Sequence, residues 1–528
     1  MADTRCEIGR TYLIPDPAAG DPPAAPDLAA ALVRAGGARA EAGDVTETAA
    51  VHHDTAGLRL AACDVTLWRG EGGHDEGWHL RLPAVLGVRG ELSAPPSPAP
   101  PGDLVRLLRS RTRGAALVPV ARLRTSRETT SLLRRDGRPL LRLTVDAVRA
   151  ERLDAPGGGP PAVTAWTEVR ARLAQGAEPA LLDRVDERLR EVGLTPSASP
   201  SPLARALART DARDARDARA EGRGRGPHGA PPEPVTAGDH LLACIGRQTD
   251  AIVALDPAVR RGLPDAVHQL RVAARRLRSV LRSYRRLLDR RRTDPVIAEL
   301  RWLGAQLAAD RDNEVLTGRL RARVAELPRT LVLGPVEARL RLWSVRREAR
   351  SRDLALTALD SDRYLALLTT LAALAADPPL RERADREAAK ALPEPVLNEY
   401  AGLARRVGQA LALPPGEERD IALHSARKAA KRVRYAAEAA EPALGPPAER
   451  FARRMKNVQQ LLGDHQDGVV ARGAARDLAV AAHAAGESAF TWGLVHAAEH
   501  EGALRCERDL PRVWAKASER RLRAALTA

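Results

Sequence analysis

Arginine side chains crowd the segment His268–Arg292, which contains ten arginines and a single acidic residue, Asp289. A planar guanidinium donates paired hydrogen bonds to phosphate or carboxylate oxygens, so a row of guanidinium groups suits a polyanion. At about 100° per residue, one face of a helix here is cationic and the other is apolar, from Leu270 to Leu288. The cationic face comprises His268, Arg271, Arg275, Arg278, Arg282 and Arg285. The spacing predicts an amphipathic helix that carries a guanidinium stripe.

The same pattern returns at His424, in the segment HSARKAAKRVRY. The second stripe comprises His424, Arg427, Lys431 and Arg434, is flanked by Lys428 and Arg432, and continues to Tyr435. Farther along, Arg301 precedes Asp312 by eleven residues, just as Lys456 precedes Asp467. The intervals from histidine to aspartate are 44 and 43 residues. These matched intervals predict an internal duplication, with two basic helices that face each other across a pseudo-twofold axis.

We interpret the stripes as a cradle for inorganic polyphosphate, which carries nearly one negative charge per phosphate and no bases. The candidate contacts are His268, Arg271, Arg275, Arg276, Arg278, Arg282, Arg301, His424, Arg427, Lys428, Lys431, Arg432, Arg434, Tyr435 and Lys456. The alternatives are a solvated charged face, a surface for acidic protein tails, and nucleic-acid binding. No aromatic platform, recognition helix or zinc finger accompanies the basic rows, which argues against nucleic acid.

The roles of several polar side chains have two interpretations. His268 and His424 either donate to phosphate or serve packing and capping. The positions four residues after them carry valine and lysine, so neither histidine has the partner of a helical metal site. Asp312 and Asp467 either orient the cations or form turns and caps, and Tyr435 either donates its hydroxyl or packs. The chain has no G-x-x-x-x-G-K-[ST] loop for a donor nucleotide, and we predict no metal and no cofactor.

The composition of the whole chain fits a soluble protein with a polyanionic partner. Its 528 residues are 44% hydrophobic, which is enough for two or three domains with ordinary cores. The net charge of +16 and the pI near 10.6 imply a polyanion. Four scattered cysteines indicate neither disulfides nor structural zinc, and no signal peptide or membrane span is evident. We therefore expect a cytoplasmic location.

The chain changes character near residue 209. Residues 1–208 alternate short β-like runs with turns, and alternation of basic and apolar residues predicts a charged lumen if the sheet closes. The predicted strands are Tyr12–Ile14, Leu58–Leu60, Val65–Trp68, Trp78–Leu82, Leu117–Leu123, Leu140–Val145 and Ala165–Leu173. Residues 209–234 are low in complexity and predict a flexible linker. Residues 235–528 are helical by period, in two repeats of about 235–392 and 393–528.

Short motifs in the first 205 residues follow one another in a recognisable order. They are Glu7-Ile-Gly-Arg-Thr11, His53-Asp54-Thr55, Leu58-Arg59-Leu60, Trp78-His-Leu-Arg81-Leu-Pro83, Arg89-Gly-Glu91, Arg124-Thr-Ser-Arg127 and Asp146. This part resembles the CYTH family of triphosphate tunnel enzymes. The resemblance implies an antiparallel β-barrel whose tunnel grips a triphosphate with basic residues and holds a divalent metal with glutamates.

The chain departs from the CYTH pattern where the metal would be held. The opening motif of that family, E-x-E-x-K, has Gly9 and Thr11 in place of its second glutamate and its lysine, and Leu67-Trp68-Arg69-Gly70 lacks the arginines of LRxR. Where the family has E-x-E-x-E, this chain has Arg170 and Arg172 after Glu168. Metal-assisted phosphoryl chemistry needs a carboxylate cluster. We therefore predict that the tunnel is not catalytic, with an active metal-dependent triphosphatase as the alternative.

The helical region carries a second set of motifs. They are Val267-His268-Gln-Leu-Arg271-Val-Ala-Ala-Arg275-Arg276-Leu-Arg278, its copy from Leu423, Leu300-Arg301-Trp302-Leu303 with Arg311-Asp312, and Leu462-Gly463-Asp464-His-Gln-Asp467. Over about 290 residues this region resembles the CHAD domain, the conserved-histidine α-helical domain often found behind CYTH. The resemblance implies an α+β multidomain chain whose helical part has two pseudo-symmetric four-helix bundles, a central basic groove and affinity for polyphosphate. Association with polyphosphate granules is the corresponding expectation for location.

Overall fold

The computed structural model describes residues 9–14, 25–36, 39–72, 75–153, 162–174, 176–197, 199, 201–210 and 234–527. The chain divides into two compact units, residues 1–230 and 231–528. The predicted linker, residues 209–234, falls almost wholly outside the described residues. Each unit is described by itself below.

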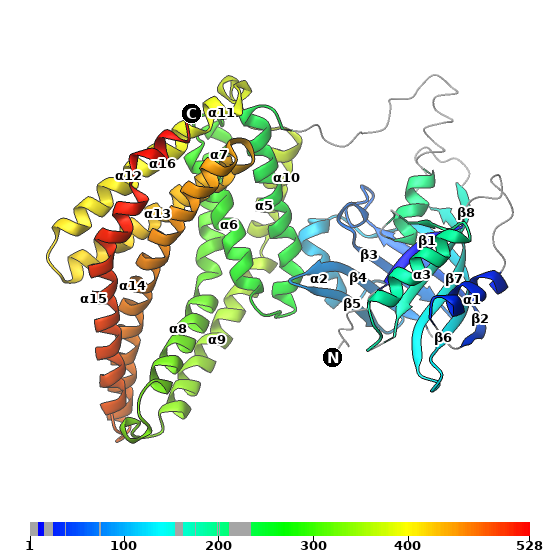
Figure 1. Cartoon of the computed structure of the whole chain (residues 1–528), viewed down its shortest axis with the longest axis horizontal. Helices are drawn as coiled ribbons and strands as arrows, with labels where there is room; N and C mark the ends of the chain where they lie inside the picture. Colours follow the sequence, from blue (N-terminus) through cyan, green and yellow to red (C-terminus); the bar gives the residue numbers. More distant parts are fainter. Residues whose placement is uncertain are drawn as a thin grey trace. The chain divides into compact units, whose positions relative to one another are not determined.

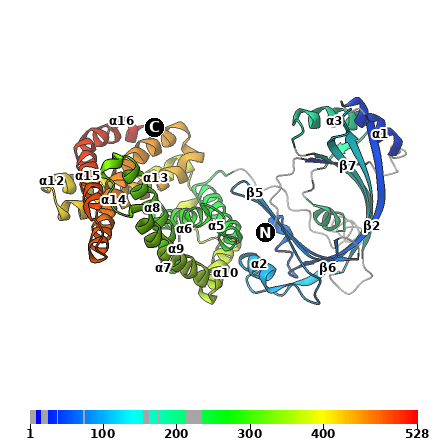
Figure 2. The ribbon, with the colours of Figure 1, turned by 90° about the horizontal axis from the view of Figure 1, so that it is seen from below.

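The described strands of the first unit form one antiparallel sheet in the order β5-β4-β3-β2-β6-β7-β8-β1-β9. They are β1 (Gly9–Leu13), β2 (Arg39–Asp54), β3 (Thr66–Glu71), β4 (Gly77–Val85), β5 (Val88–Ala94), β6 (Val118–Leu133), β7 (Pro139–Arg152), β8 (Val163–Leu173) and β9 (Thr195–Pro196). The sheet is strongly curved (Figure 2) and accompanied by α1 (Ala25–Arg34), α2 (Gly102–Thr112) and α3 (Ala180–Glu191). The predicted antiparallel sheet is confirmed, but among these strands it stays open, with β5 and β9 at its edges.

Buried apolar and less buried polar side chains alternate along the strands, as the sequence predicts. In β4, Trp78, Leu80 and Leu82 are buried, whereas His79 and Arg81 are only half-buried. The apolar side of β4 joins Leu67 and the helix α2 in one hydrophobic core. Because successive side chains of a strand point to opposite faces, the polar residues lie on the other face of the sheet.

The prediction of a strand at Leu58–Leu60 is wrong, because these residues form a turn that leads into a 3-10 helix. The buried carboxylate of Asp54 organises this turn. It accepts hydrogen bonds from the backbone N–H groups of Thr55 at 2.6 Å, Leu60 at 2.9 Å and Ala61 at 2.9 Å. Backbone N–H groups that bond to a side chain in this way are withdrawn from strand pairing.

The second unit is mostly helical over its described length, as predicted (Figure 1). Its longer helices are α5 (Ala237–Arg260), α6 (Ala266–Ser283), α7 (Arg290–Gln306), α8 (Ala308–Ala325), α9 (Val336–Asp360), α10 (Asp362–Ala376), α12 (Pro393–Ala412), α13 (Glu417–Leu444), α14 (Pro446–Ala484) and α15 (Phe490–Ala517). The short helices α11 (Ala388–Ala391) and α16 (Arg520–Ala524) complete the series. Among the described residues, no helix is both long enough and apolar enough to span a bilayer.

The two repeats share packing within this unit. In the first, α5, α6, α7 and α10 contact one another, and in the second α12, α13, α14 and α15 contact in sequence. The helices α8 and α9 contribute Leu320 and Leu340 to a core that they share with Ala475 of α14 and Trp492 of α15. The single helix α14 follows α13 where the pair α7 and α8 follows α6, so one long helix of the second repeat stands where the first has two.

The first basic helix ends earlier than its pattern predicts. The stripe was expected to extend to Arg285, but α6 ends at Ser283 and Arg285 lies in the following turn. Asp289 begins the next helix as its N-cap, with its carboxylate accepting a hydrogen bond from the Arg291 N–H at 3.0 Å. An aspartate at this position satisfies a helix-start N–H, and this favours a new helix over continuation of the old one.

Candidate cationic site between the two repeats

The basic helices α6 and α13 lie against each other through two tyrosines. The hydroxyl of the buried Tyr284 donates a hydrogen bond to the carbonyl oxygen of Ala436 at 2.7 Å. In the other direction, Arg275 Nε donates to the hydroxyl oxygen of Tyr435 at 3.2 Å. Each repeat therefore contributes one helix to a shared contact, which we call the seam. Both guanidinium stripes include residues that lie at this seam.

Tyr435 is the centre of this seam rather than an open donor. Its side chain is only 2% exposed, and its hydroxyl accepts from Arg275. The guanidinium carbons of Arg275, Arg276 and Arg434 lie 5.9, 5.6 and 4.7 Å from its ring centroid. A ring face attracts cations, so Tyr435 holds three guanidinium groups of both helices together. Of the two interpretations of this residue, packing describes its position.

Arg278 of α6 lies among the cations of three helices. Burial lowers the pKa of Arg278, and so do the positive charges of Arg301, Arg275, Arg282 and Arg432, in that order. Arg301 belongs to α7 and Arg432 to α13. A guanidinium whose pKa is lowered in this way gains little compensation from nearby acids.

Lys431 of α13, the counterpart of Arg275 in the second copy of the motif, also lies among cations of both repeats. Burial, followed by the charges of Arg427 and Arg275, lowers the pKa of Lys431 to about 7; Asp467 opposes this and Arg271 adds to it. A lysine in water has a pKa near about 10.4, so the ammonium is strongly destabilised here. We call the converging side chains of both repeats the cationic cluster. It comprises Arg271, Arg275, Arg278, Arg301, Arg427, Lys431 and Arg432.

Acids that the stripe pattern did not reveal neutralise part of the surrounding charge. Glu399 of α12 pairs with Arg432 at 3.0 Å. Glu438 pairs with Arg434 at 3.1 Å and with Arg276 at 3.4 Å. The Arg434 to Glu438 spacing of four residues was a visible signal for the second of these acids. Nothing in the local sequence indicates that Glu399 reaches the stripe.

The predicted aspartates have different outcomes. Asp467 lies 3.5 Å from Arg427 and therefore contacts a cation of the second stripe. This agrees with one of the two interpretations of Asp467 given above. The side chain of Asp312 lies outside the described side chains. Asp467 therefore orients one arginine of the cluster, and the equivalent contact in the first repeat stays a prediction.

The remaining predicted contacts lie at the edge of the cluster. Arg282, Lys428 and Lys456 are exposed, and His268 is half-buried on α6. Arg282 is linked electrostatically to Arg278. Lys456 lies on α14. The structure thus brings stripe residues of both repeats together, and the contact predicted for Lys456 stays a prediction.

His424 marks the end of the second stripe and the wall of a cavity. Burial and the neighbouring Lys428, Arg427 and Lys431 lower the pKa of His424, and a hydrogen bond with Gln466 opposes them. The imidazole is therefore neutral at pH 7. Its buried Nδ1 has no hydrogen-bond partner among the described residues.

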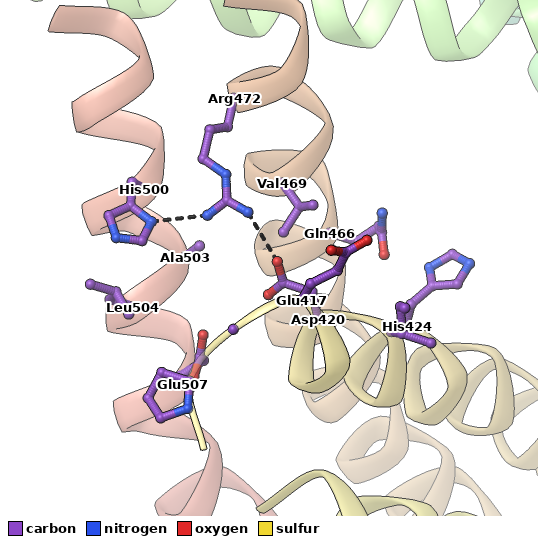
Figure 3. A pocket seen from close by; sticks show the side chains of 13 residues that line it. Glu417, Asp420, His424, Gln466, Val469, Arg472, His500, Ala503, Leu504 and Glu507 are labelled. Atoms are coloured by element: carbon purple, nitrogen blue, oxygen red, sulfur yellow. Dashed lines mark hydrogen bonds and ion pairs between the residues drawn. The ribbon is translucent and has the colours of Figure 1, made fainter. Parts of the chain in front are cut away.

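The cavity beside His424 has a volume of about 830 Å³ and lies between α13, α14 and α15 (Figure 3). Arg472 crosses it, with Nη2 donating to Asp420 Oδ2 at 3.0 Å and Nη1 lying 2.9 Å from His500 Nδ1. Glu507 lies on its wall, next to Leu504 and Ala503. This cavity was not predicted from the sequence, because its lining residues come from three separate helices and no local pattern records that they meet.

In the first unit, the residues that depart from the CYTH pattern lie next to one another. Gly9 pairs with Arg172 and Thr11 with Arg170 across strands β1 and β8. A Cβ atom on Gly9 would lie 2.7 Å from the carbonyl oxygen of Ala171, closer than real Cβ contacts. Glu7, the first residue of the expected motif, lies outside the described residues.

Arg170 occupies the space between two buried carboxylates. Its Nη2 donates to Asp146 Oδ2 at 2.7 Å and to Glu168 Oε1 at 2.9 Å. Arg127 donates to the same Asp146 through Nε at 2.7 Å and Nη2 at 3.0 Å. Asp146 is 0% and Glu168 2% exposed, so both carboxylates are committed to arginines. A divalent cation would have to displace Arg170 to reach them.

Comparison with known protein families gives a match within the helical unit. The CHAD domain profile matches residues 243–476. Two uncharacterized proteins of Mycobacterium tuberculosis, strains CDC 1551 and H37Rv, are each 34% identical over 488 residues, covering 89% of this chain and 90% of the relative.

Solved structures resemble separate parts of the chain. PptA from Streptomyces chartreusis is 25% identical and covers 53% of this chain and 100% of its own, with a TM-score of 0.45. The CHAD domain of the plant Ricinus communis is 24% identical and covers 58% of this chain and 98% of its own, with a TM-score of 0.40. A candidate adenylyl cyclase from Hippeastrum, described as having a dominant triphosphatase activity, covers 38% of this chain and 95% of its own at 16% identity and a TM-score of 0.24.

Proposed function

The chain belongs to the family of CHAD-domain proteins, and from that membership we propose that its helical unit binds inorganic polyphosphate through the cationic cluster. The observation that carries this proposal is the convergence of cations from α6, α7 and α13, which lowers the pKa of Lys431 to about 7 and also lowers that of Arg278. Cations that repel one another so strongly are stabilised by a bound anion. The cluster draws its charges from both repeats, so the ligand must present several negative charges along its length.

The chemistry of the side chains favours phosphate over other anions. Most members of the cluster are arginines, whose planar donors pair with two phosphate oxygens at once. A polyphosphate chain offers such oxygens at every unit and carries no bases to be read. Tyr435, the aromatic residue that the cations surround, is buried among guanidinium groups and offers no open face on which a base could stack. This supports polyphosphate over nucleic acid as the ligand.

The proposal is tested by titrating the protein with labelled polyphosphate and with duplex DNA at equal total charge. We expect polyphosphate to bind more tightly, and we expect its affinity to fall steeply with salt, because counterions are released as they are from DNA. Equal or tighter binding of DNA would contradict the proposal. An acidic peptide of the same charge is the matched control for a surface that accepts any acidic protein tail.

We also propose that the sheet unit does not hydrolyse triphosphates. The support is the position of Arg170, which bonds Asp146 at 2.7 Å and Glu168 at 2.9 Å and so takes the place of a cation. Metal-dependent hydrolysis needs carboxylates that are free to coordinate Mg²⁺ or Mn²⁺. The contact of a Gly9 Cβ with Ala171 O, at 2.7 Å, further opposes a glutamate at that position.

The corresponding experiment incubates the full chain with tripolyphosphate or ATP and Mg²⁺ or Mn²⁺. We expect no phosphate release above that of a heat-inactivated sample. Release that disappears in Glu7→Gln would instead support the alternative of an active tunnel triphosphatase. A polyphosphate-binding protein with a non-catalytic sheet unit is thus our proposed function, with polyphosphate granules as its proposed location.

A further inference from the structure

Three potential metal ligands from three helices converge beside the cavity at His424. They are Asp420 of α13, His465 of α14 and Glu507 of α15, and their ligand atoms all lie within 4.8 Å of one another. His465 Nε2 lies 3.3 Å from Asp420 Oδ1 and 3.5 Å from Glu507 Oε1. One imidazole and two carboxylates therefore point at a common centre.

The imidazole of His465 is buried without hydrogen bonds. Its residue is 1% exposed, and neither ring nitrogen has a hydrogen-bond partner among the described residues. Buried polar atoms are nearly always satisfied, and an exception calls for a physical cause such as an ion. Nε2 is the nitrogen that faces the two carboxylates, so it is available as a ligand atom.

In each of the two carboxylates, one oxygen pairs with an arginine and the other faces His465. Asp420 accepts from Arg472 through Oδ2 at 3.0 Å, which leaves Oδ1 toward His465. Glu507 pairs with Arg419 through Oε2 at 3.1 Å, which leaves Oε1 toward His465. Outer partners of this kind fix the orientation of metal ligands. Here they turn one oxygen of each carboxylate to the same point.

We propose that Asp420, His465 and Glu507 bind a divalent transition-metal ion of the Zn²⁺ class through Oδ1, Nε2 and Oε1. Ligand atoms about 2.0–2.2 Å from a tetrahedral Zn²⁺ lie about 3.3–3.6 Å from one another. The two separations from His465 Nε2, 3.3 and 3.5 Å, match two edges of that tetrahedron, and the two carboxylate oxygens lie within 4.8 Å of each other. A mixed nitrogen and oxygen ligand set suits Zn²⁺ better than Mg²⁺, which prefers oxygen alone.

A protonated His465 held by the two carboxylates is the competing explanation. Charge-assisted N–H···O bonds are about 2.7–2.9 Å long. The distances of 3.3 and 3.5 Å are longer, and neither makes a hydrogen bond. The spacing therefore favours an ion between the three atoms over a proton on one of them.

The fourth position of this site opens toward the cavity. Asp420 and Glu507 both line the volume of about 830 Å³, as does His424 (Figure 3). Three protein ligands with an open position distinguish an exchangeable site from a closed structural one. Water or an anion in the cavity would complete the coordination.

The test measures metal binding by the untagged full chain in the absence of polyphosphate. Competition with a chromophoric chelator gives the Zn²⁺ affinity, and the visible absorption of the Co²⁺ form gives the geometry. We expect one tight Zn²⁺ per chain, an intense four-coordinate Co²⁺ spectrum, and no competition from millimolar Mg²⁺. His465→Gln and Glu507→Gln should each weaken Zn²⁺ binding by about a hundredfold or more.

His483→Gln is the matched control, because His483 is an exposed histidine of the same helix α14. It should leave affinity, stoichiometry and the Co²⁺ spectrum unchanged. Zn²⁺ should also raise the melting temperature of the wild type and of this control. A wild-type Co²⁺ spectrum typical of octahedral aqueous ions would overturn the proposal even if the variants fold poorly. Retention of the tight site by a folded His465→Gln would overturn it as well.

Discussion

The environment of the Lys431 side chain predicts how the stability of the folded protein depends on pH. Burial, Arg427 and Arg275 lower its pKa to about 7, so the folded protein holds this ammonium weakly. The unfolded chain keeps a pKa near about 10.4 and binds more protons between these two values. Stability should therefore rise with pH from about 7 to about 10 as far as this group is concerned.

Bound polyphosphate should raise the pKa of Lys431 again, because a nearby anion stabilises its ammonium. We expect proton uptake on binding at pH 8 and weaker binding as the pH rises above 7. Isothermal titration in two buffers of different ionisation enthalpy measures the uptake directly. Lys431→Arg is the matched control, since arginine stays charged throughout this range and should abolish most of the uptake. Equal uptake by both proteins would contradict the assignment.

How far single residues could be predicted depends on whether their partners were local. The cations of both stripes were predictable from helical spacing, and α6 and α13 carry them, except for Arg285, which lies beyond the end of α6. Glu399 and His465 were not, because their partners lie on other helices and no local pattern records a contact between helices. Tyr435 shows the same limit: its place in the stripe was evident, but its burial among three guanidinium groups was not.

Elements were predicted best where their periodicity was long. The helical region and most strands follow from their periods, whereas β2, which runs from Arg39 to Asp54, lacks an apolar run to mark it. One predicted strand and one predicted helix end were wrong for the same physical reason. Asp54 draws N–H groups into a turn near Leu60, and Asp289 starts α7 where continuation of α6 was expected. In both places an aspartate side chain competes with the regular backbone pattern.

Strands β7 and β8 are joined by a buried ion-pair network that can be tested at the scale of elements. Arg170 on β8 bonds Asp146 on β7 and its own neighbour Glu168, which are 0% and 2% exposed. Arg170→Ala leaves buried carboxylates with fewer partners, a change that costs about 3–5 kcal/mol in comparable cases. Because Arg127 still bonds Asp146, we expect the lower end of this range.

Urea unfolding of the full chain, followed in the transition of the sheet unit, measures this cost. Arg188→Ala is the control, since Arg188 pairs with Glu191 on the exposed surface of α3 and should change stability far less than Arg170→Ala does. Equal effects of the two substitutions would show that the network does not stabilise the sheet. Arg170→Ala should also produce no phosphate release, because Gly9 and Arg172, which pair across β1 and β8, still supply no carboxylate to hold a metal ion.

At the scale of the whole helical unit, duplication places two similar helices in one seam. The repeats could still act as two sites, each with its own ligand. Against this, Lys431 of the second repeat is repelled by Arg271 and Arg275 of the first, and Arg278 of the first by Arg432 of the second. Charges that interact this strongly share one anion most favourably, since a single chain neutralises both sets at once.

A shared site predicts that damage to either repeat weakens binding of the same long chain. The paired substitutions are Arg278→Glu with Arg282→Glu in α6, and Lys428→Glu with Lys431→Glu in α13. Each should lower long-chain affinity by about tenfold or more, because charged hydrogen bonds of about 1.5–3 kcal/mol are lost and the second contact is no longer intramolecular. Arg508→Glu with Arg512→Glu is the control of equal charge, on exposed positions of α15. Isothermal titration separates the outcomes: a shared site keeps its stoichiometry and loses affinity in both variants, whereas independent sites would halve the stoichiometry and leave the surviving affinity intact.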